Sequence, residues 1–426
     1  MMTTAFTDHL GRPVVAVTGM GVVTSLGRGK EENWAALTSG KSGIHVINRF
    51  PTDNFNTSIA GTIDFMPEST KGAAPLSYAL AEAAAAEALS QAGIEDAFGG
   101  PLFLAAPPME LEWQHRFALD GEHQPDSVAG YGHLLENCRG SLHADYFDYS
   151  QFGSIADHLQ ERFGTTGLPI TLSTACASGA TAIQLGVEAI RRGEANRVLS
   201  VGTDGSITAE SLVRFSLLSA LSTQNGAPTK AAKPFSKDRD GFVMAEGSAA
   251  LVMESLESAV TRGAKVLGIL KGCGEKSDDF HRTRSKPDAS PAIAAVRAAL
   301  ADAGVSPDDV DYINAHGTST PENDKMEYLA LATVFGERIA AIPVSSNKSM
   351  IGHTLTAAGA VEAVFSLMTI QNSIIAPTIN NDVPDPAIAL DVVPNQSREQ
   401  AVKLVLSNSF GFGGQNTCLV MAAAAN

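Results

Sequence analysis

The chain has 426 residues, of which 44% are hydrophobic and 39 are glycine, and its formal net charge is −16 at pH 7. This size and composition predict two domains, or one large duplicated domain, with a substantial core. The negative charge argues against nucleic acid as a general partner. No run approaches the ~20 apolar residues of a membrane span, and residues 1–12 lack the apolar segment of a secretory signal.

Strands alternate with helices along the first half of the chain. Residues 14–21 predict a buried strand that runs into a glycine turn, and they lack the third glycine of a dinucleotide-binding motif. Residues 107–163 predict an irregular region. The other elements predicted here are helices at 31–38, at 77–92 and from Cys176 to residue 192, and strands at 102–105 and 197–201.

The later part of the chain repeats this alternation, which predicts α/β layers. In each half, a candidate motif stands at a strand-to-helix junction, and this suggests a duplicated α/β unit. The predicted helices cover 254–262, 291–303, 324–335 and 356–371, and the predicted strands cover 249–253, 265–272, 310–315, 342–345, 404–407 and 417–421, with a turn-rich segment at 238–246.

Cysteine and histidine usage bears on location and on metal binding. The four cysteines are scattered and form no Cys-x-x-Cys pair, which argues against a disulfide framework or a zinc site and favours a reducing, cytoplasmic location. The histidines between residues 107 and 163 have no regular ligand spacing, so no metal is expected. The cysteines are Cys138, Cys176, Cys273 and Cys418, and these histidines are His115, His123, His133, His143 and His158.

Cys176 is the first candidate catalytic residue. The segment Pro-Ile-Thr-Leu-Ser-Thr-Ala-Cys-Ala-Ser-Gly-Ala (169–180) places it between a predicted strand and a helix of small residues. The N-terminus of a helix favours a thiolate, so a thiol at this position is a candidate nucleophile. The alternative is that Cys176 is only a small buried hydrophobic side chain.

Two downstream histidines are candidate partners for this cysteine. His316 lies in Asn-Ala-His-Gly-Thr-Ser-Thr-Pro (314–321), directly after a predicted strand, where the sites of α/β proteins form. It could also be a loop histidine satisfied by local hydrogen bonds. His353 lies in Ser-Asn-Lys-Ser-Met-Ile-Gly-His-Thr (346–354), before a helix of alanine and glycine that can pack closely against a neighbour.

Two further features accompany these motifs. Lys348 is either a solvated surface charge or, if it is buried, a partner for Glu327. The glycines on both sides of Phe412, in Asn-Ser-Phe-Gly-Phe-Gly-Gly-Gln-Asn (408–416), would permit a mobile aromatic side chain. The alternative is a glycine-rich turn with two core phenylalanines.

Five motifs, in this order, resemble the β-ketoacyl-acyl-carrier-protein synthases, the elongating (KAS I/II) condensing enzymes of the thiolase superfamily. The resemblance extends from about residue 13 to residue 420. The motifs are Thr-Ala-Cys-Ala-Ser-Gly (174–179), Pro-Phe-Ser-Lys-Asp-Arg-Asp-Gly-Phe (234–242), the His316 motif (314–321), Lys-Ser-Met-Ile-Gly-His-Thr (348–354) and Asn-Ser-Phe-Gly-Phe-Gly-Gly (408–414).

The resemblance implies an α/β fold of the thiolase type, with duplicated halves in a five-layer αβαβα arrangement. Residues 13–264 would form the N-terminal half, with the nucleophile and an insertion around 107–163. Residues 265–422 would form the C-terminal half, with both catalytic histidines.

The resemblance also implies a role for each reactive group. Cys176 would carry the acyl chain as a thioester. His316 and His353 would stabilise the enolate that forms when malonyl-carrier protein loses CO2. The backbone N–H groups of Cys176 and Phe412 would form the oxyanion hole, and Phe412 would gate the acyl pocket. Lys348, with Glu327, would hold the histidine region in place. The substrate-binding residues would be Thr318, Thr320, Phe410 and Met109.

The implied partners are an acyl-carrier protein, which delivers both substrates, and a second copy of the chain in a homodimer. No cofactor would be bound, because phosphopantetheine arrives on the carrier. The segment 67–89 keeps only Lys71 where relatives have several basic residues for carrier docking. Arg282, Arg284 and Lys286 are a candidate substitute, and the alternative is that they are solvated loop charges.

The implied reaction is fatty-acid elongation by a 3-oxoacyl-carrier-protein synthase. Residues 107–113 replace a glycine-rich stretch near the acyl pocket, so a specialised-lipid or polyketide ketosynthase is the main alternative. A degradative thiolase would need a second cysteine as base, and Cys418 lies on a strand-like run beyond the glycine loop. A non-catalytic chain-length-factor-like partner would have lost Cys176.

Overall fold

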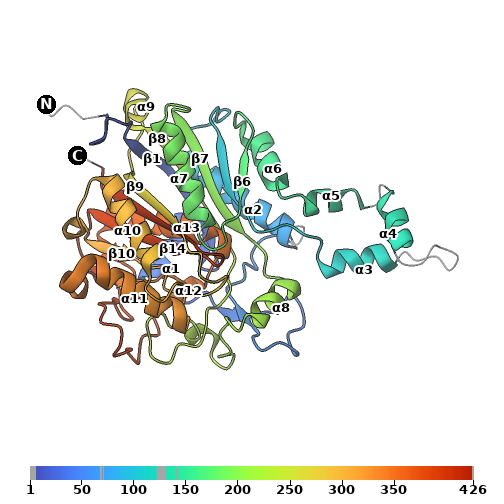
Figure 1. The fold of residues 1–426 in the computed structure, drawn as a ribbon. Coiled ribbons are helices and arrows are strands. Elements are labelled where there is room, and N and C mark those ends of the chain that lie inside the picture. The colour runs from blue at the N-terminus through green and yellow to red at the C-terminus, as the bar shows by residue number, and fades with distance from the viewer. Residues whose placement is uncertain (1–5, 68–69, 71, 122–130, 141–142, 425–426) are drawn as a thin grey trace.

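The computed structural model describes residues 6–67, 70, 72–121, 131–140 and 143–424 (Figure 1). Their main feature is one mixed sheet of eleven strands. One half of this sheet contains β1 (Val15–Thr24), β5 (Leu102–Ala105), β6 (Ile170–Leu172), β7 (Arg197–Asp204) and β8 (Gly247–Ser255), with β2 (Gly27–Arg28) paired to β1. The other half contains β9 (Gly268–Ser277), β10 (Tyr312–Asn314), β11 (Val344–Ser345), β14 (Leu404–Phe410) and β15 (Gln415–Ala422).

The two halves of the sheet repeat one strand pattern. From the outer edge inward, β6, β5 and β7 are parallel, and β8 and β1 follow antiparallel. In the same way β11, β10 and β14 are parallel, and β15 and β9 follow antiparallel. The halves meet where β1 pairs with β9. The boundary predicted at 264/265 falls between α9 (Leu256–Thr261) and β9.

Helices cover both outer faces of the sheet and fill the space between its halves. The long helices are α1 (Gly29–Thr38), α2 (Ala73–Gln91), α7 (Ser178–Arg191), α10 (Ser290–Ala303), α11 (Pro321–Phe335) and α13 (Ala358–Asn372). Leu102 and Leu104 of β5 belong to the hydrophobic cluster under α2. Phe103 and Ala105 belong to the hydrophobic cluster that contains residues of α7 and α13. Helices α10 and α11 cover the outer face of the second half. The α/β class and the αβαβα layers expected from the sequence are confirmed.

The central layer consists of α7 and α13, which pack through small residues. A Cβ atom on Gly179 of α7 would lie 2.6 Å from the Ala360 nitrogen, and one on Gly359 of α13 would lie 2.5 Å from the Ala180 nitrogen. These helices can approach only because both positions lack a side chain. The close packing expected for the small-residue helix after His353 is therefore present.

The predicted glycine turn after the first strand is wrong. β1 continues through Gly19 and Gly21 to Thr24. A Cβ atom on Gly19 would overlap the Ala88 carbonyl oxygen, and one on Gly21 would overlap that of Ala84. The glycines therefore allow the alanine-rich α2 to lie directly on the strand.

The prediction that residues 107–163 are irregular is also wrong for the described part of this segment. It contains α3 (Trp113–Gly121), α4 (Tyr131–Cys138), α5 (Asp145–Ser150) and α6 (Ser154–Phe163). Helix α6 packs on the body, where Ile155, Ala156 and Leu159 join the hydrophobic cluster under α2. Figure 1 shows α3, α4 and α5 extending away from the sheet as an arm. Residues 122–130, with His123, lie outside the described residues.

We predict that Gly359→Ala lowers the free energy of unfolding by about 1–3 kcal/mol, because the new methyl group meets the α7 backbone. A glycine-to-alanine change in an open helix interior would instead stabilise by roughly 1 kcal/mol. Gly226→Ala is the matched control, since a Cβ atom there would have no atom within 4 Å. Chemical denaturation measures both variants. An unchanged or higher stability of Gly359→Ala would contradict close packing of the two helices.

Candidate active site

Cys176 lies in a tight turn between β6 and α7. Ala175, just before it, has a φ of +50°, a conformation that non-glycine residues rarely adopt. Ser178 holds this turn, because its Oγ accepts from the Thr174 N–H at 2.7 Å and donates to the Ala175 carbonyl at 2.5 Å. The thiol is thereby placed two residues before the first turn of α7, and the side chain is buried.

Burial raises the pKa of the Cys176 thiol to about 11. The backbone N–H of Phe412 and the charge of Lys348 act in the opposite direction, and Asp204 adds to the rise. At neutral pH the resting group is therefore a thiol, whereas its position before a helix suggested a thiolate. The Phe412 N–H therefore lies beside the sulfur, and its part in an oxyanion hole stays a prediction.

His316 follows β10, and its loop is held by Glu327. The backbone N–H groups of His316 and Gly317 donate to the two carboxylate oxygens of Glu327 at 2.8 and 2.7 Å. The Lys348 ammonium donates to the His316 carbonyl at 2.7 Å and lies 3.4 Å from its Nδ1. An ammonium cannot accept, so Nδ1 is the acceptor and the proton of the neutral ring is on Nε2.

His353 follows the short helix α12 (Lys348–Ile351), and its backbone pairs with residues 243–245. Its N–H donates to the Val243 carbonyl at 2.7 Å, and its carbonyl accepts from the Ala245 N–H at 2.9 Å. The Leu355 N–H donates to Nδ1 of His353 at 3.3 Å, so the ring proton is on Nε2. That Nε2 is buried and finds no hydrogen-bond partner among the described residues.

The three side chains converge on one point. One ligand atom from each of Cys176, His316 and His353 lies within 4.8 Å of the others, and the ring centroids of the histidines are 5.3 Å apart. Burial, and then the charge of Lys348, lowers the pKa of both imidazoles well below the usual range. Two neutral rings with their protons on Nε2 can donate hydrogen bonds to an oxygen that gains negative charge. Thiol and imidazole groups are also zinc donors, so the expected lack of a metal stays a prediction.

The predicted partner of Lys348 is wrong. Lys348 is buried and is therefore not a solvated surface charge. Its ion-pair partner, however, is Glu362 of α13. Glu327 instead accepts from the His316 loop and from the Asn408 side-chain amide at 3.0 Å. Sequence reasoning missed Glu362, although it is the only charged residue in α13. A lone charge in an apolar helix was the available signal.

The converging groups open into a cavity of about 360 Å³. Of the predicted substrate-binding and gating residues, Thr318, Thr320, Phe410 and Phe412 line it. The hydroxyls of Thr318 and Thr320 are 2.9 Å apart, and Thr320 also caps α11.

The Phe412 loop is tied to the loop at 278–286. The Gly413 N–H donates to the Arg282 carbonyl, and the Asp278 N–H donates to the Gly414 carbonyl, both at 2.7 Å. A Cβ atom on Gly411 would lie 2.9 Å from the Thr174 carbonyl oxygen, so this loop packs directly on the cysteine turn. Side-chain-free backbone on both sides of Phe412 is consistent with the predicted gate.

Two other candidates lie outside this cavity. Met109 packs against the cluster under α2, and its segment is fastened by Glu112, which accepts from the Ala73 N–H, and by Glu210, which accepts from the Trp113 N–H. Contact of Met109 with substrate therefore stays a prediction. Cys418 is buried in β15 on the face toward α10 and does not line the cavity. Lys71 lies outside the described residues.

Among the described residues, no helix has both the length and the hydrophobicity needed to cross a membrane. All four cysteines are free.

Comparison with known proteins connects this geometry to one family. Residues 12–98 and 138–259 match the family model of the beta-ketoacyl synthase N-terminal domain, and residues 267–382 match that of the C-terminal domain. The chain is 35% identical to 3-oxoacyl-[acyl-carrier-protein] synthase 2 of Coxiella burnetii, over 96% of this chain and 98% of that protein. It is 37% identical to the ketoacyl synthase alpha subunit of the tetracenomycin polyketide synthase of Streptomyces glaucescens, over 98% of both.

Solved structures agree with these relatives. A beta-ketoacyl synthase from Burkholderia phymatum superposes with a TM-score of 0.83 at 31% identity, covering 97% of this chain and 100% of that chain. A type II polyketide ketosynthase, solved with its acyl-carrier protein and bound to a hexaketide, gives a TM-score of 0.82 at 32% identity with the same coverage. The chain belongs to the β-ketoacyl synthase family.

Proposed function

We propose that this protein is a 3-oxoacyl-acyl-carrier-protein synthase that elongates fatty acids by decarboxylative condensation. The observation that carries the proposal is the pair of neutral histidines, each with its proton on Nε2, beside the Cys176 thiol. The relatives named 3-oxoacyl-[acyl-carrier-protein] synthase 2 support fatty-acid elongation as the reaction.

The first step loads the acyl chain onto Cys176. Its sulfur attacks the thioester carbonyl of the acyl-carrier substrate, and the N–H groups of Cys176 and Phe412 stabilise the oxyanion. The bond to the phosphopantetheine sulfur breaks. Because the pKa of Cys176 is about 11, the thiol must give up its proton during attack, and that proton ends on the departing phosphopantetheine thiol.

The second step forms the carbon–carbon bond. Malonyl-carrier protein loses CO2, and its thioester oxygen takes the negative charge of the enolate. The Nε2–H groups of His316 and His353 donate to that oxygen. The enolate carbon attacks the acyl thioester, the bond to Cys176 breaks, and the released thiolate takes one proton. In this proposal phosphopantetheine belongs to the carrier, and the enzyme binds no cofactor.

A polyketide or specialised-lipid ketosynthase is the second candidate, because the chain is 37% identical to the tetracenomycin ketosynthase subunit. That enzyme class shares the chemistry and differs in acyl chain and carrier. Assays with acyl chains of graded length on the housekeeping carrier separate the two. Ordinary medium chains are the expected preference for elongation.

The partner at the cavity mouth is proposed to be an acidic acyl-carrier protein. Arg282 and Arg284 are exposed and line the mouth, and Lys286 follows on the same loop. A solved relative is a ketosynthase in complex with its acyl-carrier protein. Basic side chains at the entrance would steer an acidic carrier toward Cys176.

A homodimer and a cytoplasmic location complete the proposal. β6 is an edge strand of the sheet, and Ile170 on it and Leu168 just before it are 46% and 91% exposed. Unpaired edges with exposed apolar side chains are sites of pairing with another chain. Free cysteines fit a reducing compartment.

We expect sedimentation equilibrium to give twice the mass of one chain, and Ile170→Lys to weaken that association by placing charge on the edge strand. A wild-type protein that stays monomeric at micromolar concentration would contradict the homodimer.

Substitutions of the reacting groups should separate the two chemical steps. Cys176→Ala should abolish both acyl-enzyme formation and condensation. His353→Ala should still accept the acyl chain but lose condensation by about 10²–10³-fold, because one donor to the enolate is removed. Intact-protein mass spectrometry measures loading, and product formation measures condensation. Condensation by Cys176→Ala would refute the mechanism.

Charge reversal at the mouth tests carrier docking. Arg282→Glu with Arg284→Glu should raise the KM for malonyl-carrier protein at least about 10-fold, since like charges would face each other. The effect on a small pantetheine thioester should be much weaker. Lys41→Glu with Lys265→Glu, an equal charge change at two exposed sites outside the cavity, is the control. Equal KM changes for both substrates would argue against docking at this loop.

A further inference from the structure

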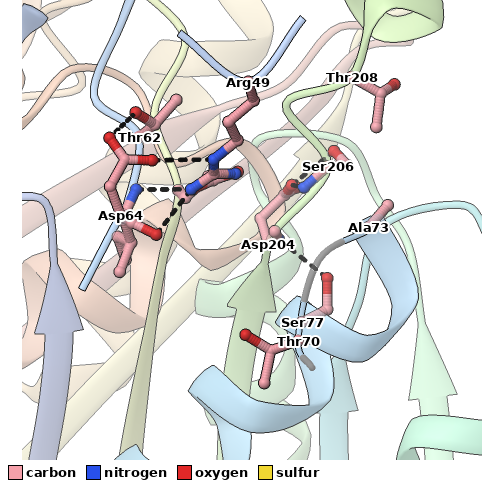
Figure 2. Close-up of polar contacts among 12 residues, drawn as sticks. Arg49, Thr62, Asp64, Thr70, Ala73, Ser77, Asp204, Ser206 and Thr208 are labelled. Carbon is pink, nitrogen blue, oxygen red and sulfur yellow. Dashed lines mark hydrogen bonds and ion pairs between the residues drawn. The ribbon is translucent and has the colours of Figure 1, made fainter. Parts of the chain in front are cut away.

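A buried carboxylate that the mechanism does not use lies at the end of β7. Asp204 is 1% exposed and accepts four hydrogen bonds. One oxygen accepts from the Ser206 N–H and hydroxyl at 3.0 and 2.6 Å. The other accepts from the Thr356 N–H at 3.2 Å and from the Thr356 hydroxyl at 2.7 Å. This hydroxyl also lies 2.7 Å from the Thr203 carbonyl oxygen, so its one proton is shared between the carboxylate and that carbonyl. Figure 2 shows Asp204 beside Ser206, with Ser77 of α2 below it.

We propose that Asp204 is a positioning residue for His353, which it fixes through Thr356 and the neighbouring Leu355 N–H. This inference rests on the proposed function, because it assigns the geometry of one enolate donor to a residue that touches no reacting atom.

The connection passes through one short helical turn. Thr356 is the middle residue of a 3-10 turn (Leu355–Ala357) that follows the His353 motif. Leu355, its first residue, donates its N–H to Nδ1 of His353. This bond fixes the tautomer that leaves a proton on Nε2. Holding Thr356 in place therefore holds the donor that prepares His353.

Backbone strain makes this support necessary. Leu355 has a φ of +46°, a conformation that is costly for a branched side chain and persists only when surrounding contacts enforce it. The two bonds from Thr356 to Asp204 are such contacts. Without them, Leu355 can relax, and its N–H would turn away from Nδ1 of His353.

Asp204 is itself anchored on the opposite side. The Ser77 hydroxyl accepts from the Gly205 N–H at 2.8 Å, and the Thr203 hydroxyl donates to the Ser77 carbonyl at 2.7 Å (Figure 2). A Cβ atom on Gly205 would lie 2.8 Å from the Ser77 nitrogen, so β7 and α2 are in close contact here. The carboxylate therefore connects the 3-10 turn to a rigid part of the fold.

The backbone of His353 is held separately. It pairs with Val243 and Ala245, and the adjacent Glu246 is fully buried and paired with Arg49 at 2.6 Å. Because these contacts fix the backbone of His353, only the orientation and tautomer of its ring remain to be set. The Leu355 N–H sets the tautomer and orientation of this ring, and the Asp204–Thr356 contact sets the Leu355 N–H.

Only a carboxylate satisfies all four donors. In Asp204→Asn, the amide nitrogen must face the N–H of either Ser206 or Thr356, and two donors cannot bond to each other. Burial raises the pKa of Asp204, and its hydrogen bonds from Ser206 and Thr356 act in the opposite direction without cancelling the rise.

A matched pair at Thr356 tests the proposal without removing the buried charge. Thr356→Ser keeps the hydroxyl that donates to Asp204, and Thr356→Val keeps the shape but loses the hydroxyl. We expect Thr356→Val and Asp204→Asn to lower condensation and malonyl-carrier decarboxylation about 10-fold to 100-fold, as misplaced catalytic groups do. Loading of Cys176 should be unchanged in Thr356→Val, which keeps the Asp204 charge, and Thr356→Ser should behave like wild type.

The readouts are acyl-enzyme formation by mass spectrometry and CO2 release from malonyl-carrier protein. Full decarboxylation by Thr356→Val, or equal loss of loading and decarboxylation, would overturn the positioning role. Equal losses in Thr356→Val and Thr356→Ser would also overturn it, because the hydroxyl would then not matter. If the wild type itself neither loads nor decarboxylates these substrates, the proposed function fails instead, and the two failures remain distinct.

Discussion

The contact between α7 and α13 is the constraint on which the site depends. Each helix follows a reactive turn, and the turns carry Cys176 and His353. Because Gly179 and Gly359 lack side chains, the helices approach until backbone meets backbone. Their N-terminal ends then bring the thiol and the imidazole together, although 177 residues separate them in the sequence. A duplicated fold thus supplies one reactive group from each copy at the same junction.

Burial gives these groups their chemical state. Removal from water raises the pKa of the thiol and lowers the pKa values of both imidazoles, so all three are neutral at rest. Lys348, whose charge acts on all three groups, is paired with Glu362 in the interior. Its cation disfavours protonation of the histidines and favours a thiolate at Cys176. The arrangement therefore has little charge at rest and is ready for the negative charge that appears during reaction.

Sequence motifs predicted the reactive residues and the layered architecture, but not every contact between them. Strand-to-helix junctions and small-residue helices are local patterns, so Cys176, His316 and the α/β layers could be anticipated. The five-layer αβαβα arrangement followed from the resemblance to the condensing enzymes. The partner of Lys348 depended on which helix packs against the histidine loop, and the sequence pattern gave no sign that α13 would bring Glu362 to it. Gly19 and Gly21 were predicted to form a turn. Their actual role is to let α2 lie directly on β1, and the sequence near these glycines does not show that a helix packs there. The helices of 107–163 were missed because most of their apolar residues have no core to face.

Strained backbone occurs at both reactive turns. Ala175 and Leu355 have left-handed φ values, and each is held by a side chain that follows it within three residues, Ser178 for the cysteine turn and Thr356 for the histidine turn. In both cases the strained conformation orients a group differently from a relaxed turn. In the cysteine turn this group is the thiol, and in the histidine turn it is the Leu355 N–H, which is directed toward Nδ1 of His353. Strain of this kind requires rigid surroundings, which the α7–α13 contact and the buried carboxylates provide.

The Phe412 loop contrasts with these strained turns. Glycines flank the aromatic residue, and two backbone hydrogen bonds attach the loop to residues 278–286. Any movement of Phe412 must break or carry along these bonds, so the loop that contains Arg282 and Arg284 is connected directly to the residue predicted to be the gate.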